Sequence, residues 1–352
     1  MKNNFKLKAS FGLSLLLSTL LYADNLENYI KKYEPIHYNI LKENGIDIIK
    51  DLDREKRHNF EDRVSTFSLE ELTVYKAKEL CQRNEGIFLE NRYIATCVSS
   101  DGTFGNGSER LGMTFNPDGT GTVLSPDYLQ PGTPFEFFSV GFNGSSYTNN
   151  NRNGGEVVLP QDNIPIVSLQ ALNRTSNIHG GAIIKSKIDN LEITQEYTLD
   201  PNSREIIIRV ELYNRGKSAI EKLFYARGID PDQDRPTTYN TFNLRGGSFA
   251  NLTVAPENLV QATGLKNKLR TIGLYSVDPI KHNTCVSADW ITNPMDIYFC
   301  DANLPSSLSD NTINISFYLE TLKSGEKKML LFKYLFENKK SIAMSMPLPI
   351  KK

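Results

Sequence analysis

Hydrophobic and polar residues alternate through most of the chain from residue 92 onward. The alternation is clearest in six segments, each bounded by turn-forming residues such as Gly, Asn, Pro and Asp. These segments cover residues 183–188, 191–199, 205–213, 223–227, 313–319 and 329–336. Alternation of this kind is typical of strands that bury one face. Because no helical pattern separates the segments, the sequence predicts a mainly β fold, a large antiparallel β-sandwich over residues 92–338.

Three segments depart from strict alternation, and each of them predicts a local feature of the fold. Residues 206–208 and 330–332 are consecutive apolar residues, which predicts strands that are buried on both faces. The stretch 147–155 is polar and rich in glycine and asparagine, which predicts an exposed loop.

The residues before the sandwich have a helical pattern instead. Apolar side chains recur with helical spacing at Leu26, Tyr29, Ile30 and Tyr33. Ser68 and Glu71 have the spacing of a capping box, which indicates the start of a helix. The sequence therefore predicts a short helical segment over residues 24–91, ahead of the sandwich, and a tail over residues 339–352.

The first 23 residues resemble a secretory signal peptide. Three lysines precede an apolar stretch over residues 11–22, and Ala23 stands at the expected cleavage position. We therefore expect an exported protein, in the periplasm or at the cell surface; the alternative is an uncleaved N-terminal anchor. No later segment approaches 18 consecutive apolar residues, so we expect no transmembrane helix in the mature chain.

The charge balance argues against one class of partner. The net charge is −1, and loss of residues 1–23 makes it −4 because three lysines and no acidic residue are removed. A chain of this charge has no electrostatic reason to bind nucleic acid or an anionic membrane.

Four cysteines form two pairs that are close in sequence, Cys81 with Cys97 and Cys285 with Cys300. In an oxidising compartment an even number of cysteines indicates disulfides, and proximity favours these two pairs over the other two connectivities. A zinc site is the alternative, which the absence of a C-x-x-C spacing and four scattered histidines disfavours.

Three short segments are candidate binding sites. The first contains Asp230, Asp232 and Asp234, whose alternate carboxylates would suit Ca²⁺. It lacks the Gly and Glu that an EF-hand loop requires, and the alternative is an acidic turn made rigid by Pro231 and Pro236.

The second segment contains Phe135, Phe137 and Phe138, which follow a Pro-Gly turn. Exposed aromatic rings there would stack on sugars, whereas the alternative is a strand that enters the core. Trp290 lies between Cys285 and Cys300, and we expect it to belong either to a lid or to a corner packed against a disulfide.

The third segment contains His179 followed by two glycines, which would let a backbone and an imidazole approach a small ligand closely. The alternative is a glycine turn with an incidental histidine. No Ser-His-Asp order, G-x-S-x-G, H-E-x-x-H or phosphate-binding loop is present.

Short motifs resemble the aldose 1-epimerases, or galactose mutarotases. Asn173-Arg174 followed by His179-Gly180-Gly181 is similar to their "NR…HGG" element, and residues 322–326 with 333–336 resemble their final strand pair. The resemblance implies a galactose-mutarotase-like supersandwich. It also implies that Arg174 and His179 line a sugar site.

The chain departs from that family at the expected general acid. The family has a second histidine after its central strands, but here no histidine lies between Gly180 and Lys281. Glu320 stands where the resemblance would place the catalytic base. The turn at residues 131–136 and the strand end at 230–234 also resemble β-sandwich modules of uncharacterised secreted bacterial proteins.

Together these patterns predict an exported binding or interaction module for a glycan, another envelope component or another protein. One alternative is a carbohydrate-active enzyme related to aldose 1-epimerases, with His179, Glu320 and His282 as its catalytic residues. Another is a structural protein whose helical segment mediates assembly of the envelope or an appendage. A shared fold does not decide between these functions.

Overall fold

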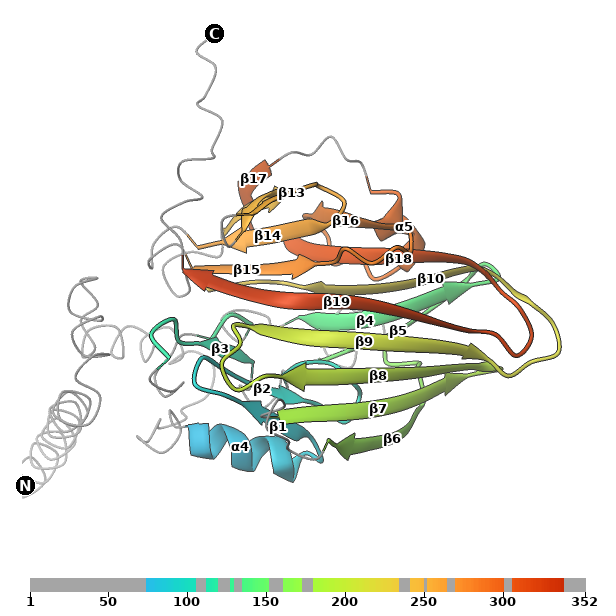
Figure 1. The fold of residues 1–352 in the computed structure, drawn as a ribbon, viewed down its shortest axis with the longest axis horizontal. Coiled ribbons are helices and arrows are strands. Elements are labelled where there is room, and N and C mark those ends of the chain that lie inside the picture. Colours follow the sequence, from blue (N-terminus) through green and yellow to red (C-terminus); the bar gives the residue numbers. More distant parts are fainter. Residues whose placement is uncertain are drawn as a thin grey trace, which may run out of the picture. The chain divides into compact units, whose positions relative to one another are not determined.

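The alternating strands form two large antiparallel sheets that pack face to face (Figure 1). The computed structural model describes residues 74–105, 112–119, 127–129, 135–151, 161–172, 180–233, 241–249, 252–264, 270–300 and 306–338. All of them belong to one compact unit, Val74–Lys352. The fold is the mainly β sandwich that the sequence predicts.

The larger sheet has nine strands. In spatial order they are β17 (Ser306–Ser309), β11 (Thr241–Arg245), β14 (Leu259–Thr263), β15 (Arg270–Tyr275), β19 (Lys327–Asn338), β9 (Glu205–Asn214), β8 (Leu191–Leu199), β7 (Gly180–Ile188) and β6 (Ile166–Ala171). The smaller sheet has five strands: β16 (His282–Ser287), β18 (Thr312–Leu322), β10 (Ile220–Ile229), β4 (Glu136–Phe142) and β5 (Ser145–Asn150).

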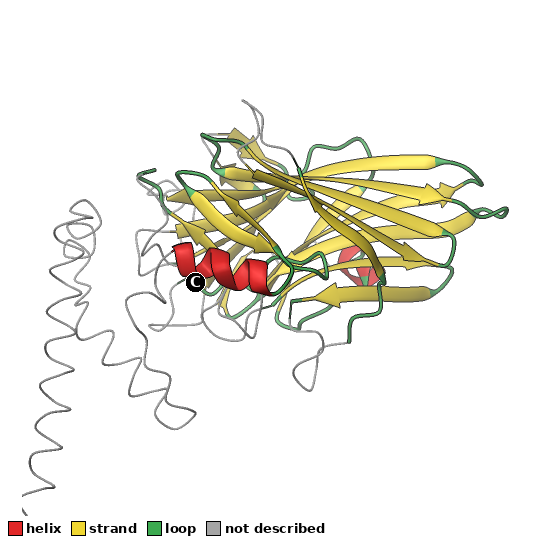
Figure 2. Cartoon of the chain, turned by 90° about the horizontal axis from the view of Figure 1, so that it is seen from below, coloured by secondary structure: helices red, strands yellow, loops and turns green. Residues whose placement is uncertain are grey.

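Short elements complete the described part of the chain. Strands β1 (Ile87–Glu90), β2 (Ile94–Val98) and β3 (Met113–Phe115) form a three-stranded sheet, and β12 (Gly247–Phe249) pairs with β13 (Leu252–Val254). The two helices are α4 (Val74–Arg83) and α5 (Pro294–Tyr298), of which α4 contacts β1 and β2 (Figure 2). Neither is long and apolar enough to cross a membrane.

The burial pattern of β8 shows why this sequence forms a strand with one face in the core. Every second residue from Leu191 to Leu199 is closed to solvent, and the residues between them are half-buried. Strand β9 alternates in the same way. The chain passes between the two large sheets several times, including at the β9–β10 and β18–β19 connections. The six predicted strands are confirmed as β7, β8, β9, β10, β18 and β19.

The prediction of strands buried on both faces is wrong. Ile206 and Ile208 are fully buried, but Ile207 between them is half-buried. Leu330 and Phe332 likewise flank a half-buried Leu331. Both strands therefore have one core face, and the intervening apolar residue packs on the outer face of the sheet.

The predicted exposed loop at residues 147–155 is wrong in its described part. Residues 145–150 form β5, and the side chains of Asn149, Asn150 and Asn151 are buried. Hydrogen bonds explain how a core accepts these amides: Asn149 Nδ2 donates to Ile164 O at 2.9 Å, and Asn151 Nδ2 donates to Phe104 O at 3.2 Å. The three asparagines therefore form a buried, hydrogen-bonded row at the end of β5.

The predicted helical segment ends earlier than its pattern indicates. Helix α4 lies within it, but residues 87–90 form strand β1, which pairs with β2. A disulfide between Cys81 and Cys97 joins α4 to β2. Residues 1–73, with the leader and the first predicted helices, lie outside the described residues, as do residues 339–352.

One buried ion pair connects the two large sheets. Arg227 on β10 and Glu136 on β4 are both closed to solvent, with Nε–Oε1 at 2.5 Å and Nη2–Oε2 at 3.0 Å. Buried charges are stable only when other hydrogen bonds satisfy their remaining atoms. Those partners come from the larger sheet, because Arg227 Nη1 donates to Gln195 Oε1 at 3.1 Å and to the Tyr197 hydroxyl at 2.9 Å.

Aromatic residues enclose this ion pair. Tyr334 on β19 donates to Glu136 Oε1 at 2.6 Å, and Phe104 N–H donates to Glu136 Oε2 at 2.7 Å. The Phe104 ring lies 5.0 Å from the Arg227 guanidinium, in cation–π geometry. Burial raises the pKa of Tyr197 to about 12, so its hydroxyl stays protonated and donates to Gly102 O at 2.5 Å.

A half-buried acid, Asp162, lies beside the buried asparagines of β5. Asp162 Oδ1 accepts the N–H of Asn150 at 2.9 Å. Burial raises the pKa of Asp162 to about 7, and the negative charge of Asp101 acts in the same direction. Asp162 therefore holds its proton in the native state at a pH where an aspartate in an unfolded chain is ionised.

We predict that Arg227→Met lowers the free energy of unfolding by about 3–5 kcal/mol, because it leaves Glu136 as an uncompensated buried charge. Urea unfolding followed by circular dichroism measures the change. The control is Arg209→Met, which removes an exposed ion pair with Glu196 at 3.6 Å and should cost about 1 kcal/mol or less. Equal losses for the two variants would contradict the role of the buried pair.

We also predict that Asp162 makes stability fall as the pH rises from about 4 to about 7. In that range the unfolded chain binds fewer protons at this residue than the native state does, so a higher pH favours unfolding. Asp162→Asn should flatten the profile and raise the thermal midpoint above that of the unmodified chain at pH 8. Scanning calorimetry at pH 4, 6 and 8 tests this, with Asp289→Asn at an exposed position as control; parallel profiles for all three proteins would refute it.

Candidate functional site

A disulfide-closed loop covers the outer face of the five-stranded sheet. Cys285 on β16 bonds to Cys300, and the intervening residues contain α5. Asn293 caps this helix by accepting the N–H of Met295, and Pro294 occupies its first turn. Both predicted disulfides are thus confirmed.

The loop is anchored to the sheet beneath it. Ser316 Oγ on β18 donates to Pro294 O at 2.7 Å, and Asn283 Nδ2 on β16 donates to Tyr298 O at 2.8 Å. The approach is so close that a Cβ at Gly141 on β4 would lie 2.9 Å from Pro294 Cγ. The loop is therefore held by a disulfide, by hydrogen bonds and by direct packing.

Side chains of this loop and of β18 form a partly aromatic surface. We call Met295, Tyr298, Phe299 and Tyr318 the aromatic patch. Phe299 is 69% exposed and Met295 is 43% exposed, and the two tyrosines are half-buried. Beneath them Phe224 on β10 is buried and stacks on Tyr318 with ring centroids 4.5 Å apart.

The rings of the patch fix one another. The centroids of Tyr298 and Phe299 are 5.1 Å apart with an interplanar angle of 89°, and those of Tyr298 and Tyr318 are 5.6 Å apart. Edge-to-face contacts of this kind are the preferred geometry of aromatic pairs. The patch is therefore an ordered, partly apolar surface that needs little rearrangement to receive a ligand.

A charged pair borders the patch. Lys281 Nζ contacts Glu320 Oε1 at 2.5 Å, and both side chains are more than half exposed. The hydrogen bond from Lys281 and its positive charge lower the pKa of Glu320, and the same contact raises the pKa of Lys281. Both groups are therefore charged at neutral pH and offer a donor and an acceptor to solvent.

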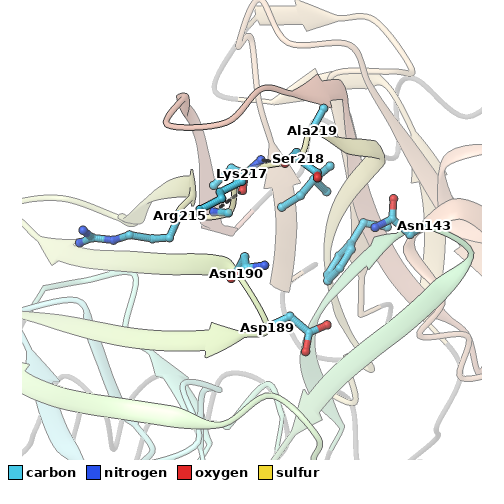
Figure 3. Close-up of a pocket in the computed structure, with 11 residues that line it drawn as sticks. Asn143, Asp189, Asn190, Arg215, Lys217, Ser218 and Ala219 are labelled. Carbon is cyan, nitrogen blue, oxygen red and sulfur yellow. Dashed lines mark hydrogen bonds between the residues drawn. The ribbon is translucent and has the colours of Figure 1, made fainter.

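A separate pocket of about 560 Å³ lies where three strand connections meet (Figure 3). Phe142 and Ile220 form its apolar floor, each less than a tenth exposed. Its polar walls come from the β4–β5 turn, the β7–β8 turn and the β9–β10 connection. Figure 3 shows Arg215 extending away from the other labelled residues, toward Glu192, which it contacts at 2.8 Å.

The hypothesis that Phe135, Phe137 and Phe138 stack on a sugar is wrong. All three rings are closed to solvent. Phe135 and Phe137 pack under the disulfide-closed loop, where Trp290 stacks on Phe135 at 5.5 Å, and Phe138 lies in the core between the sheets. The alternative, a strand that enters the core, describes β4 correctly, and Trp290 belongs to a corner packed near the disulfide.

The structure does not bring Glu320 and His282 together. His282 Nδ1 donates to Ile280 O at 2.7 Å, His282 Nε2 lies 3.1 Å from Asn258 Oδ1, and the ring lies 5.3 Å from Phe317 in the core. Lys281, its neighbour on the strand, faces the opposite side and holds Glu320. Arg174 and His179 lie outside the described residues, so their predicted sugar-binding role stays a prediction.

The acidic turn is not the solvated turn that one interpretation of the sequence predicts. Asp230 and Asp232 are buried, not solvated, and Asp234 lies outside the described residues. Within the described ranges no group of three His, Cys, Asp or Glu side chains could hold a metal ion. Calcium binding at this turn stays a prediction.

The aromatic patch is not among the sites that the sequence predicts, although two signals point to it. Asn293-Pro294 is a helix start, which would place the next residues on a short helix inside the predicted Cys285–Cys300 loop. Tyr318 lies in the predicted strand 313–319, on the face opposite to the core residues Phe317 and Leu319. Sequence alone could not show that these two segments meet.

No protein-family model and no curated protein matches the chain. Among solved structures it is similar to a bacterial glucoamylase complexed with acarbose, with TM-score 0.45 and 9% identity over 72% of this chain and 32% of the glucoamylase. It is also similar to a galactose mutarotase related enzyme from Lactobacillus acidophilus, with TM-score 0.32 and 10% identity over 72% of this chain and 97% of the enzyme.

A third similar structure is a TPR-domain containing protein from Parabacteroides distasonis, with TM-score 0.38 and 13% identity over 75% of this chain and 49% of that protein. The chain thus spans about a third of the glucoamylase and half of the TPR-domain protein. The chain is structurally similar to these proteins at low identity, and this similarity assigns neither a family nor an activity to it.

Proposed function

We propose that this chain is an exported carbohydrate-binding module whose aromatic patch holds the sugar. The observation that carries the proposal is the position of Phe299, an exposed ring on a loop that a disulfide and a packed sheet hold in place. An apolar ring of this size has no role in the core of the fold. Its exposure is best explained by a ligand that covers it.

Sugar rings fit such a surface because one face of a pyranose carries mainly C–H groups. Aromatic side chains offer a large, rigid apolar area to those groups, and the tyrosine hydroxyls add polar contacts at the edge. Since the disulfide and the hydrogen bonds of α5 already order the loop, binding loses little conformational entropy. A preformed patch can therefore bind a ligand of modest size.

The charged pair supports a hydroxyl-rich ligand. Lys281 donates and Glu320 accepts hydrogen bonds, and both charges stay exposed to solvent. Sugar hydroxyls can accept from the first and donate to the second. A sugar has an apolar C–H face and polar hydroxyl groups. The aromatic rings complement the first, and the charged pair complements the second.

The extent of the patch favours a glycan over a large protein partner. Its exposed apolar part consists of Phe299, Met295 and the edges of two tyrosines. A standard protein–protein interface uses roughly 20–30 residues on each side. A polysaccharide of the cell envelope needs only such a local contact.

Export is supported by two independent features. The N-terminal sequence resembles a signal peptide, and the two disulfides are of the kind that forms in an oxidising compartment. In the periplasm or at the cell surface the chain meets envelope polysaccharides directly.

We predict that the chain binds β-1,4-linked N-acetylglucosamine oligomers or malto-oligosaccharides, and that Phe299→Ala and Tyr318→Ala each weaken binding about five- to tenfold. That factor corresponds to the roughly 1–1.5 kcal/mol that an aromatic contact supplies beyond its buried area. Isothermal titration calorimetry measures both series. The matched control is Met329→Ala, which removes a 58% exposed apolar side chain on β19 and should leave affinity unchanged.

Other outcomes would contradict the proposal in distinct ways. Equal affinities for Phe299→Ala, Met329→Ala and the unmodified chain would place the site elsewhere. Faster mutarotation of glucose or galactose, followed by polarimetry, would favour an epimerase. A stable oligomer that binds no glycan and is lost on deletion of residues 24–91 would favour an assembly protein.

A further inference from the structure

We infer that the pocket of Figure 3 is a second subsite for the same glycan, so that the ligand is an extended polysaccharide chain and not a single sugar or a chain end. This inference rests on the proposed function, because it takes the aromatic patch as the first subsite. Beyond the proposed function, it specifies that the ligand is a polysaccharide and that the polysaccharide runs from the patch to the pocket.

The pocket has the composition of a sugar subsite. Phe142 and Ile220 give it an apolar floor, and Asn143, Asp189, Asn190 and Lys217 give it polar walls. Within the described part of the chain no hydrogen bond occupies the side chains of Asp189, Asn190 or Lys217. These side chains can donate to and accept from hydroxyl groups, and Figure 3 shows Asp189, Asn190 and Asn143 on neighbouring turns around the opening.

A short series of contacts joins the pocket to the patch. Asn143, in the pocket wall, accepts the N–H of Glu221 at 3.3 Å and donates its own N–H to Glu221 O at 3.2 Å. The Glu221 carboxylate accepts from Thr321 Oγ1 at 2.5 Å, and Thr321 follows Glu320 at the border of the patch. These contacts link the pocket wall to the border of the patch along β10 and the end of β18.

The spacing of the two sites suits several consecutive sugar units. Ile220 in the pocket floor and Phe224 under the patch are four residues apart on β10, at most about 13 Å at the rise of an extended strand. A ligand that reaches both sites must therefore be longer than one ring. A polysaccharide chain laid along the end of this strand satisfies that requirement.

The strand between the two sites has an irregular backbone. The β10–β18 register shifts around Leu223, Lys222 has a φ of 51° and Glu320, which pairs with Leu223, has a φ of 60°. Residues without glycine's freedom rarely adopt such angles, and bulges of this kind redirect side chains near functional surfaces. The side chains of Lys222 and Glu320 are both exposed at this bulge, and Glu320 borders the patch.

Chain-length dependence tests this inference. Oligomers of β-1,4-linked N-acetylglucosamine and of α-1,4-linked glucose, each from one to six units, are titrated into the full chain by calorimetry. We expect affinity to rise at least fivefold between the dimer and the hexamer of the series that binds. The double variant Asn190→Ala/Lys217→Ala should remove this gain while leaving dimer affinity unchanged, whereas Phe299→Ala should weaken both oligomers.

Asn202→Ala supplies the matched control, since Asn202 is exposed in the β8–β9 turn, at the other end of β8 from Asn190. Equal affinity for the dimer and the hexamer would overturn the extended site but leave the patch as a binding site. So would a double variant that behaves like Asn202→Ala. Absence of binding by every oligomer, or a Phe299→Ala variant with unchanged affinity, would overturn the proposed function and this inference with it.

Discussion

The buried ion pair between Arg227 and Glu136 is the constraint on which the rest of the structure depends. It ties β10 and β4 of one sheet to β8 and β19 of the other through Gln195, Tyr197 and Tyr334, and every one of these side chains is closed to solvent. Because a buried charge is tolerated only with a complete set of partners, the spacing and register of the two sheets follow from this contact. A solvent-borne ligand cannot reach the space that these residues fill.

The side chains that we propose for binding consequently lie on the outside of the sandwich. On the smaller sheet, the disulfide-closed loop buries Phe135 and Phe137 beneath it and turns Phe299 toward solvent. The fold thus separates two uses of aromatic side chains. Those on β4 supply core packing on both faces of the strand, and Tyr298, Phe299 and Tyr318 form a surface.

Sequence alone could predict much of this fold, because alternation reports directly on one-sided burial. The residues of β8 illustrate this, since the predicted and observed strands coincide over 191–199. Alternation fails at β4, where the loop covers the outer face and both faces are buried, so three aromatic residues that were expected at the surface lie inside. It fails again at β5, because buried hydrogen bonds and not apolar contacts hold its asparagines.

The candidate site was harder to predict, since it combines segments that are distant in sequence. The two disulfides follow from cysteine spacing, and Glu320 was singled out, but Lys281, Phe299 and Tyr318 come together only through the pairing of β16 with β18 and the anchoring of α5. Composition cannot reveal such a juxtaposition. The buried ion pair could not be predicted from the sequence either, because Glu136 and Arg227 are 91 residues apart in the chain.

The most direct test of glycan binding at the aromatic patch uses the methionine methyl groups as reporters. Met295 lies in the patch, Met329 is exposed on the larger sheet and Met113 is fully buried. In a titration of ¹³C-methyl-labelled chain with the N-acetylglucosamine hexamer and then the maltohexaose, we predict a saturable shift of the Met295 signal with at least one of them, while the signals of Met329 and Met113 stay in place. A shift at Met329 without one at Met295, or no shift with either oligomer, would contradict a glycan site on the disulfide-closed loop.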